Sequence, residues 1–147
     1  MKKINIFYAD DDEDDLMLFN EVVEKISNDY ENQINLHIHL NGESLIENIK
    51  RYKDSDGVVF LDINMPLQSG FEILEKIRKE PEISQFPVIM YSTSSNKDSI
   101  VQSQNLGANF YVVKPYEFST LLKMISTFIQ MNWKNYHDEK NNFLYKG

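Results

Sequence analysis

The sequence contains no cysteine, and this absence removes several classes of chemistry at once. Disulfide bonds, zinc sites built from thiolates and catalysis by a thiol nucleophile all require that residue. Internal repeats and low-complexity tracts are also absent, so the solenoid and disordered classes are not indicated. A chain of 147 residues with ordinary apolar and charged fractions predicts one domain with a sizeable core.

Long apolar runs and an excess of basic residues are missing as well. No run approaches the roughly 20 apolar residues that a membrane-spanning helix needs. Met1, Lys2 and Lys3 lead straight into a strand-like segment, which is not a secretory pattern. The net charge of −8 opposes binding to a nucleic-acid backbone, which demands clustered Lys and Arg. These features predict an acidic cytoplasmic protein with neither a membrane nor a nucleic acid as partner.

Strand-like and helix-like segments alternate along the chain. Strand character is found at residues 4–9, 34–40, 58–61, 88–91 and 110–113. Helical spacing of apolar residues is found at residues 16–26, 42–52, 71–79, 97–105 and 118–129, and Asp12 is expected to cap the first helix. Such alternation predicts a single doubly wound α/β domain with five parallel strands and helices on both faces. The second strand alternates apolar and polar residues, which is typical of an edge strand.

The domain is expected to occupy residues 1–133, and residues 134–147 form a polar C-terminal tail. Phe143, Leu144 and Tyr145 are apolar or aromatic residues within that tail. They could dock on a partner protein, but a frayed terminus is the favoured interpretation.

Polar side chains stand at the ends of four of the predicted strands. Asp10 and Asp11 follow the first strand, Asp62 the third, Ser92 the fourth and Lys114 the fifth. The carboxyl ends of parallel strands lie on one edge of the sheet, where ligands bind, so these groups can converge. Carboxylates brought close together repel one another unless a cation is present. Oxygen-only ligands favour Mg²⁺, which also keeps waters and binds substrate phosphates.

This constellation predicts phosphoryl chemistry. Asp62 would be the nucleophile that attacks a phosphoryl donor and forms an acyl phosphate. Mg²⁺, Lys114 and the Ser92 hydroxyl would hold the phosphoryl oxygens as charge develops in the transition state.

These motifs resemble the receiver domain of two-component response regulators. An acidic pair (Asp10-Asp11), a phospho-accepting Asp62 followed by Met65-Pro66 and Gly70, a hydroxyl residue at Ser92 and Lys114-Pro115 match the family pattern in order over residues 4–131. The resemblance implies a flavodoxin-like sheet of order 2-1-3-4-5. It also implies that Asp11 and Asp62 bind Mg²⁺ directly, that Asp10 acts through water and that the Asn64 backbone carbonyl is a further ligand. Ser92 and Tyr111 would be the switch residues.

The same resemblance implies the biological role. The chain would be a chemotaxis-type single-domain response regulator, a phosphoprotein that accepts a phosphoryl group from a histidine kinase or phosphotransfer protein. It would not be an enzyme, although it would assist its own phosphorylation and dephosphorylation. Residues 92–96 and 106–111 resemble the stand-alone regulators that serve bacterial phytochrome-type kinases. The output would be a contact with a downstream protein, and a homodimer through the fourth helix, fifth strand and fifth helix or through the tail is a further expectation.

Several alternatives are open on the residues alone. A degenerate receiver that is never phosphorylated and acts as a protein-interaction module is the main rival function. Asp10, Asp12, Asp14 and Glu21 also match four positions of a calcium-binding loop, but Asp15 replaces its required glycine. An aspartyl phosphatase would need an acid where Asn64 stands. His37 and His39 favour a partly solvated edge strand over a metal site. Glu13, Asp14 and Asp15 are expected to be solvated.

Overall fold

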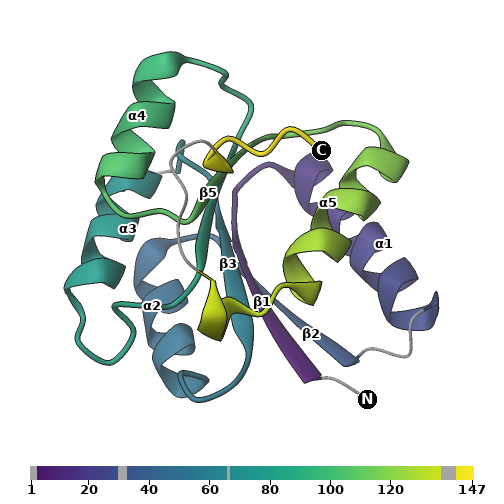
Figure 1. Cartoon of the computed structure of the whole chain (residues 1–147), viewed down its shortest axis with the longest axis horizontal. Coiled ribbons are helices and arrows are strands. Elements are labelled where there is room, and N and C mark those ends of the chain that lie inside the picture. The colour runs from purple at the N-terminus through teal and green to yellow at the C-terminus, as the bar shows by residue number, and fades with distance from the viewer. Residues whose placement is uncertain (1–2, 30–32, 66, 137–141) are drawn as a thin grey trace.

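A parallel β-sheet forms the centre of the molecule (Figure 1). The computed structural model describes residues 3–29, 33–65, 67–136 and 142–147, so Pro66 of the Met-Pro motif and residues 137–141 of the predicted tail lie outside the described residues. The strands are β1 (Lys3–Ala9), β2 (Gln33–His39), β3 (Gly57–Leu61), β4 (Val88–Ser92) and β5 (Phe110–Val113). Their spatial order is β2-β1-β3-β4-β5, which confirms the topology that the resemblance implies.

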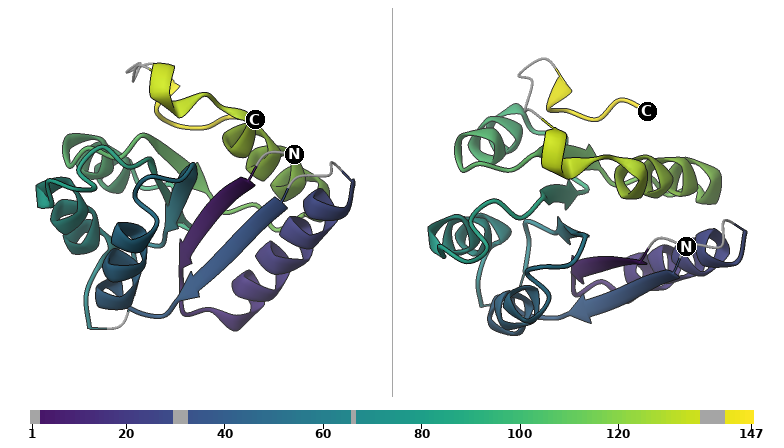
Figure 2. Two further views of the ribbon diagram at one scale, coloured as in Figure 1. Left: turned by 90° about the horizontal axis from the view of Figure 1, so that it is seen from below. Right: turned by 60° about the horizontal axis from the view of Figure 1, so that its bottom comes forward.

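Helices cover both faces of this sheet, as the alternation of segments predicts. The helices are α1 (Glu13–Asp29), α2 (Gly42–Arg51), α3 (Gly70–Lys79), α4 (Lys97–Asn105) and α5 (Phe118–Gln130), followed by the 3₁₀ turn η1 (Trp133–Asn135). Helices α1 and α5 pack on one face, and α2, α3 and α4 on the other (Figures 1 and 2). Each face therefore has its own apolar core. Among the described residues, no helix combines the length and apolarity that crossing a bilayer requires.

The edge strand β2 carries apolar residues toward α1 and histidines toward α2. Ile34 and Leu36 pack against the core beneath α1. The His37 ring stacks on Phe7 with centroids 4.8 Å apart, and its Nε2 lies 3.0 Å from Asn5 Oδ1. Burial lowers the pKa of His37, which favours the neutral form of the ring. The predicted edge position of this strand is confirmed.

The register of the sheet sets the position of the functional side chains. Ala9 is paired with Leu61, and Leu61 with Met90, so the residues that follow β1 and β3 leave the sheet together. The ladder continues one step further, because the backbone N–H of Asp62 donates to the Ala9 carbonyl at 3.0 Å. The N–H of Lys114 likewise donates to the Ser92 carbonyl at 2.8 Å. The ends of four strands therefore meet at one edge.

The described part of the C-terminal tail packs along the free edge of β5. The N–H of Tyr111 donates to the Phe143 carbonyl, and the N–H of Tyr145 donates to the Tyr111 carbonyl, both at 2.9 Å. Leu144 thereby forms a parallel bridge with Tyr111. Phe143 is buried in the core beneath α4, and the Tyr145 ring packs on Phe128. The expectation of a frayed terminus is wrong for residues 143–145, because the unpaired edge of β5 offers them both hydrogen bonds and an apolar site.

Replacing Phe143 with alanine is expected to release this tail from β5. The buried ring contributes about 2 kcal/mol of apolar burial, so its loss increases the population of the detached tail roughly 30-fold. Hydrogen exchange at the Tyr111 amide, whose acceptor is the Phe143 carbonyl, should accelerate by a similar factor while amides of β1 keep their rates. Lys146→Ala, at an exposed tail position, is the control. Unchanged exchange at Tyr111 in the Phe143 variant would contradict this account.

Candidate functional site: an acidic cluster around a buried lysine

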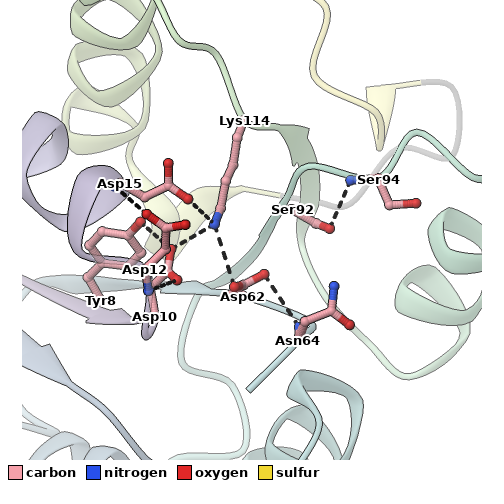
Figure 3. A network of polar contacts seen from close by, with 9 residues as sticks. All are labelled: Tyr8, Asp10, Asp12, Asp15, Asp62, Asn64, Ser92, Ser94 and Lys114. Atoms are coloured by element: carbon pink, nitrogen blue, oxygen red, sulfur yellow. Dashed lines mark hydrogen bonds and ion pairs between the residues drawn. The ribbon is translucent and has the colours of Figure 1, made fainter. Parts of the chain in front are cut away.

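Three carboxylates and one ammonium group gather where the strands end (Figure 3). Asp10 follows β1 and Asp62 follows β3, and both are buried although they carry carboxyl groups. Lys114, which follows β5, reaches back across the edge and is only 3% exposed at its side chain. Its Nζ lies 2.7 Å from Asp10 Oδ2, 2.7 Å from Asp15 Oδ2 and 3.5 Å from Asp62 Oδ2. This arrangement brings together groups that are about 50 to 100 residues apart in the chain.

Both oxygen atoms of Asp10 accept hydrogen bonds from protein donors. The Tyr8 hydroxyl donates to Oδ2 at 2.6 Å, Lys114 donates to the same atom, and the N–H of Asp12 donates to Oδ1 at 3.0 Å. Burial alone would raise the pKa of Asp10, but the hydrogen bonds from Lys114 and Tyr8 outweigh it and hold that pKa below its usual range. Asp10 is therefore ionised at neutral pH, and its lone pairs leave a metal ion little direct access.

Asp62 has the opposite electrostatic situation. Burial raises its pKa to about 6; the nearby charge of Lys114 lowers it, and the negative charge of Asp10 raises it further. Within the described part of the chain, its one backbone donor is the N–H of Asn64, which lies 3.4 Å from Oδ1. Asp62 is thus a carboxylate with spare lone pairs and an unfavourable charge. Spare lone pairs allow a carboxylate to act as a nucleophile or as a metal ligand. Binding a cation would also offset the cost of burying its charge.

The donor set fits a hard divalent cation. Ligand atoms of Asp10, Asp11 and Asp62 lie within 4.8 Å of one another. Asp11 is exposed, and within the described residues no group donates a hydrogen bond to its carboxylate. All of the available donor atoms are oxygens, which suits Mg²⁺ or Mn²⁺ rather than a softer metal. The fit is best for Asp11 and Asp62 as direct ligands, since Asp10 is already occupied.

Ser92 lies to the upper right of the Asp62 carboxylate in Figure 3, and the Lys114 amine to its upper left. It is fully buried at the end of β4, and its Oγ accepts a hydrogen bond from the N–H of Ser94 at 3.1 Å. Tyr111 does not join the carboxylates. Its hydroxyl donates to the Ser94 carbonyl at 2.8 Å, so its side chain is tied to the loop that follows Ser92. The burial of the Tyr111 ring raises the pKa of its hydroxyl, which remains a donor at neutral pH.

Two residues of the cluster are not among the predicted site residues. Tyr8 precedes Asp10 by two positions, and residues i and i+2 of a strand lie on the same face, which is the signal that could have found it. Asp15 was expected to be solvated, and this expectation is wrong, because its carboxylate bonds to Lys114 and its side chain is 14% exposed. Glu13 and Asp14 are exposed as expected. The calcium-loop alternative is also wrong, since Asp14 and Glu21 lie within helix α1.

The loop from Asp62 to α3 depends on Gly70. A Cβ atom at this position would lie 2.2 Å from the Asp62 carbonyl oxygen and 2.8 Å from the Cα of Ile63. Both are backbone atoms, and Gly70 N–H also donates to the Ile63 carbonyl at 2.7 Å. The start of α3 is therefore in contact with the backbone that positions Asp62, and only glycine fits there.

Replacing Gly70 with alanine is expected to destabilise the chain by about 3 kcal/mol, because the clash is with backbone that cannot rotate away. Urea unfolding monitored by circular dichroism would measure the change. Gly147→Ala is the matched control, since a Cβ at that terminal residue has nothing within 4 Å. Equal stability of the two variants would show that the contact between α3 and the Asp62 backbone relaxes at little cost.

With this geometry established, the class of protein follows from comparison with known proteins. The model of the response regulator receiver domain matches residues 6–126, and the chain belongs to this family. Receiver domains are signalling proteins that in general take a phosphoryl group from a kinase, and they bind Mg²⁺ or Mn²⁺ at an acidic pocket.

Several individual response regulators are similar to this chain. The chain is 30% identical over 122 residues to response regulator Rcp1 of Synechocystis sp., a match that covers 82% of each chain. The solved structure of the phosphorylated cyanobacterial phytochrome response regulator RcpA is 25% identical with a TM-score of 0.68, covering 89% of this chain and 94% of that one. The bacteriophytochrome response regulator RtBRR is 28% identical with a TM-score of 0.66, covering 95% and 84%. A solved structure of Rcp1 holds Mn²⁺.

Proposed function

We propose that the chain is a phosphorylation-dependent signalling switch whose phosphoacceptor is Asp62. The observation that carries this proposal is the position of the Lys114 ammonium, 3.5 Å from a buried Asp62 carboxylate that has spare lone pairs. A buried carboxylate with a raised pKa beside a fixed cation is a frequent feature of functional sites. The phosphoryl donor is a histidine kinase or a phosphotransfer protein, and the names of RcpA and RtBRR favour a kinase of the phytochrome type.

The chemistry follows from the roles that the side chains can take. An oxygen of Asp62 attacks phosphorus, a new oxygen–phosphorus bond forms, and the bond to the donor breaks as the donor leaves with its electron pair. In Figure 3 the Lys114 amine lies to the upper left of the Asp62 carboxylate and the Ser92 hydroxyl to its upper right, so they can bind two different phosphoryl oxygens. Asp11, Asp62 and the Asn64 carbonyl would hold Mg²⁺, with Asp10 acting through a bound water, and the ion would supply positive charge for the phosphoryl group. The same groups would assist hydrolysis of the acyl phosphate.

The output is a change of protein contacts on the face formed by α4, β5 and α5, where tail residues 143–145 already pair with the edge of β5 at Tyr111. Three large apolar side chains are exposed there, namely Val101 (45%), Val113 (38%) and Phe118 (38%). Tyr111 connects this face to the site, because its strand is β5 and its hydroxyl bonds to the loop after Ser92. The partner is a downstream protein or a second copy of the chain, and the setting is the cytoplasm. Sedimentation of the free and phosphorylated chain would test the homodimer, which an unchanged monomer mass would exclude.

Intact mass spectrometry tests the phosphoacceptor directly. The chain is incubated with a small acyl phosphate and Mg²⁺, and the expected result is the added mass of one phosphoryl group. The addition should disappear in Asp62→Asn and when a chelator removes the cation. If the chain stays unlabelled under conditions that label a control receiver, the alternative holds, in which a degenerate receiver acts only as a protein-interaction module.

A further inference from the structure

Asp15 occupies an unusual position for an acidic residue. In helix α1, Phe19, Val22 and Ile26 form the stripe that is fully buried against the sheet. Asp15 lies four residues before Phe19, so it extends the same stripe by one turn toward the site. The N–H of Asp15 donates to the Asp12 side chain at 3.0 Å, which fixes the first turn of the helix. The carboxylate is thereby directed inward at the edge of the sheet, toward Lys114.

The contact with Lys114 competes with the proposed phosphoryl chemistry. An ammonium group has three N–H donors. Two of them are used by Asp10 and Asp15, each at 2.7 Å, while Asp62 is farther away at 3.5 Å. The side chain of Lys114 is 3% exposed, so the ammonium exchanges these partners for one another rather than for bulk water. A phosphoryl group on Asp62 would use this ammonium as its cation, and its oxygens would compete with Asp15 for the position of the ammonium.

We propose that Asp15 is a positioning residue that restrains the Lys114 ammonium on the α1 side of the site and so slows phosphorylation of Asp62. This inference rests on the proposed function and adds a residue that sets its rate. Asp15 slows phosphorylation in two ways. It holds the cation away from the incoming phosphoryl oxygens, and its own charge repels an anionic donor. Asp10 still holds Lys114 when Asp15 is replaced by asparagine, so the lysine stays in the site.

The test compares three variants in phosphorylation by a small acyl phosphate at saturating Mg²⁺. Asp15→Asn keeps the size of the side chain but removes its charge, and we expect the donor concentration for half-maximal rate to fall about three- to fivefold. Asp14→Asn makes the same change of net charge one residue earlier, at an exposed position without contact to Lys114, and should match the unsubstituted chain. Asp15→Glu retains the charge and should return the value toward that of the unsubstituted chain. The difference between Asp15→Asn and the unsubstituted chain should shrink at high salt.

Each result is decisive. Equal values for Asp15→Asn and Asp14→Asn would overturn the restraint, and so would slower phosphorylation of Asp15→Asn, which would mean that Asp15 is needed to present the lysine. Thermal unfolding of the variants separates these effects from a loss of structure. If the unsubstituted chain itself accepts no phosphoryl group, the proposed function fails and this inference falls with it. If it is phosphorylated and Asp15→Asn behaves like Asp14→Asn, the inference alone fails.

Discussion

Replacing Lys114 with methionine is expected to destabilise the chain by about 3 to 5 kcal/mol at pH 7 in the absence of divalent cations. The substitution keeps the length and the apolar stem of the side chain but removes the charge. It leaves Asp10, which is fully buried, without the cation that compensates its charge, and it also leaves Asp15 and Asp62 without their shared partner. An uncompensated buried charge is among the most costly changes that a single substitution can make.

The loss of stability in the Lys114 variant is expected to depend on pH, because it involves the ionised form of Asp10. Lys114 and Tyr8 hold the pKa of Asp10 below its ordinary value, so this carboxylate contributes stability above its unfolded pKa, and the contribution is lost as the pH falls through the folded value. The difference between the two chains should therefore be largest at neutral pH and should disappear only below the ordinary Asp pKa of 3.8. Urea unfolding across this range measures it, with Lys123→Met on the exposed side of α5 as the control. A constant difference at all pH values would point to lost packing instead.

Replacing Asp62 with asparagine should stabilise the metal-free chain at neutral pH while abolishing its phosphorylation. Burial raises the pKa of Asp62 from 3.8 to about 6, so above pH 6 the folded state carries a carboxylate that it disfavours. Because the folded pKa is raised, the contribution of this group to stability is complete below its unfolded pKa and is lost as the pH rises through about 6. The gain for Asp62→Asn is expected to be about 1 to 3 kcal/mol at pH 8 and close to zero at pH 4.

Unfolding curves in the presence of a chelator measure this gain, and addition of Mg²⁺ provides an internal control. The cation should stabilise the unsubstituted chain more than the variant, because it relieves the repulsion that the variant already lacks. Lower stability of Asp62→Asn at pH 8 would contradict the raised pKa. It would mean that the attraction between Lys114 and Asp62 exceeds the cost of burying the carboxylate.

The convergence of the site could be predicted because it follows from topology. Once the apolar runs are assigned as parallel strands, Asp62 and Lys114 must lie on the same edge whatever the details of packing. The fold order is likewise implied by the family resemblance and agrees with the alternating pattern of β2. Ser92 and Tyr111 lie near this edge, but their roles as switch residues remain predictions.

The contacts that could not be predicted depend on distances that no periodicity encodes. Asp15 is one of six consecutive acids, and composition alone does not distinguish it from Asp14. Only its spacing from Phe19 marks it as inward-facing. Tyr8 would be assigned to the core as an aromatic residue in a strand, and its hydroxyl contact with Asp10 requires the actual position of the carboxylate. The pairing of Leu144 with Tyr111 is a single long-range bridge, which local patterns do not reveal.

The tail along β5 bears on the solubility of the chain. An uncovered outer strand presents backbone groups that can recruit strands of other molecules into aggregates, and natural sheets protect such strands. Here the outward-facing amide and carbonyl of Tyr111 are both satisfied by residues 143 and 145. A protease that removed the last few residues would therefore uncover a template for intermolecular pairing, and the trimmed protein would be more prone to precipitate than the intact one.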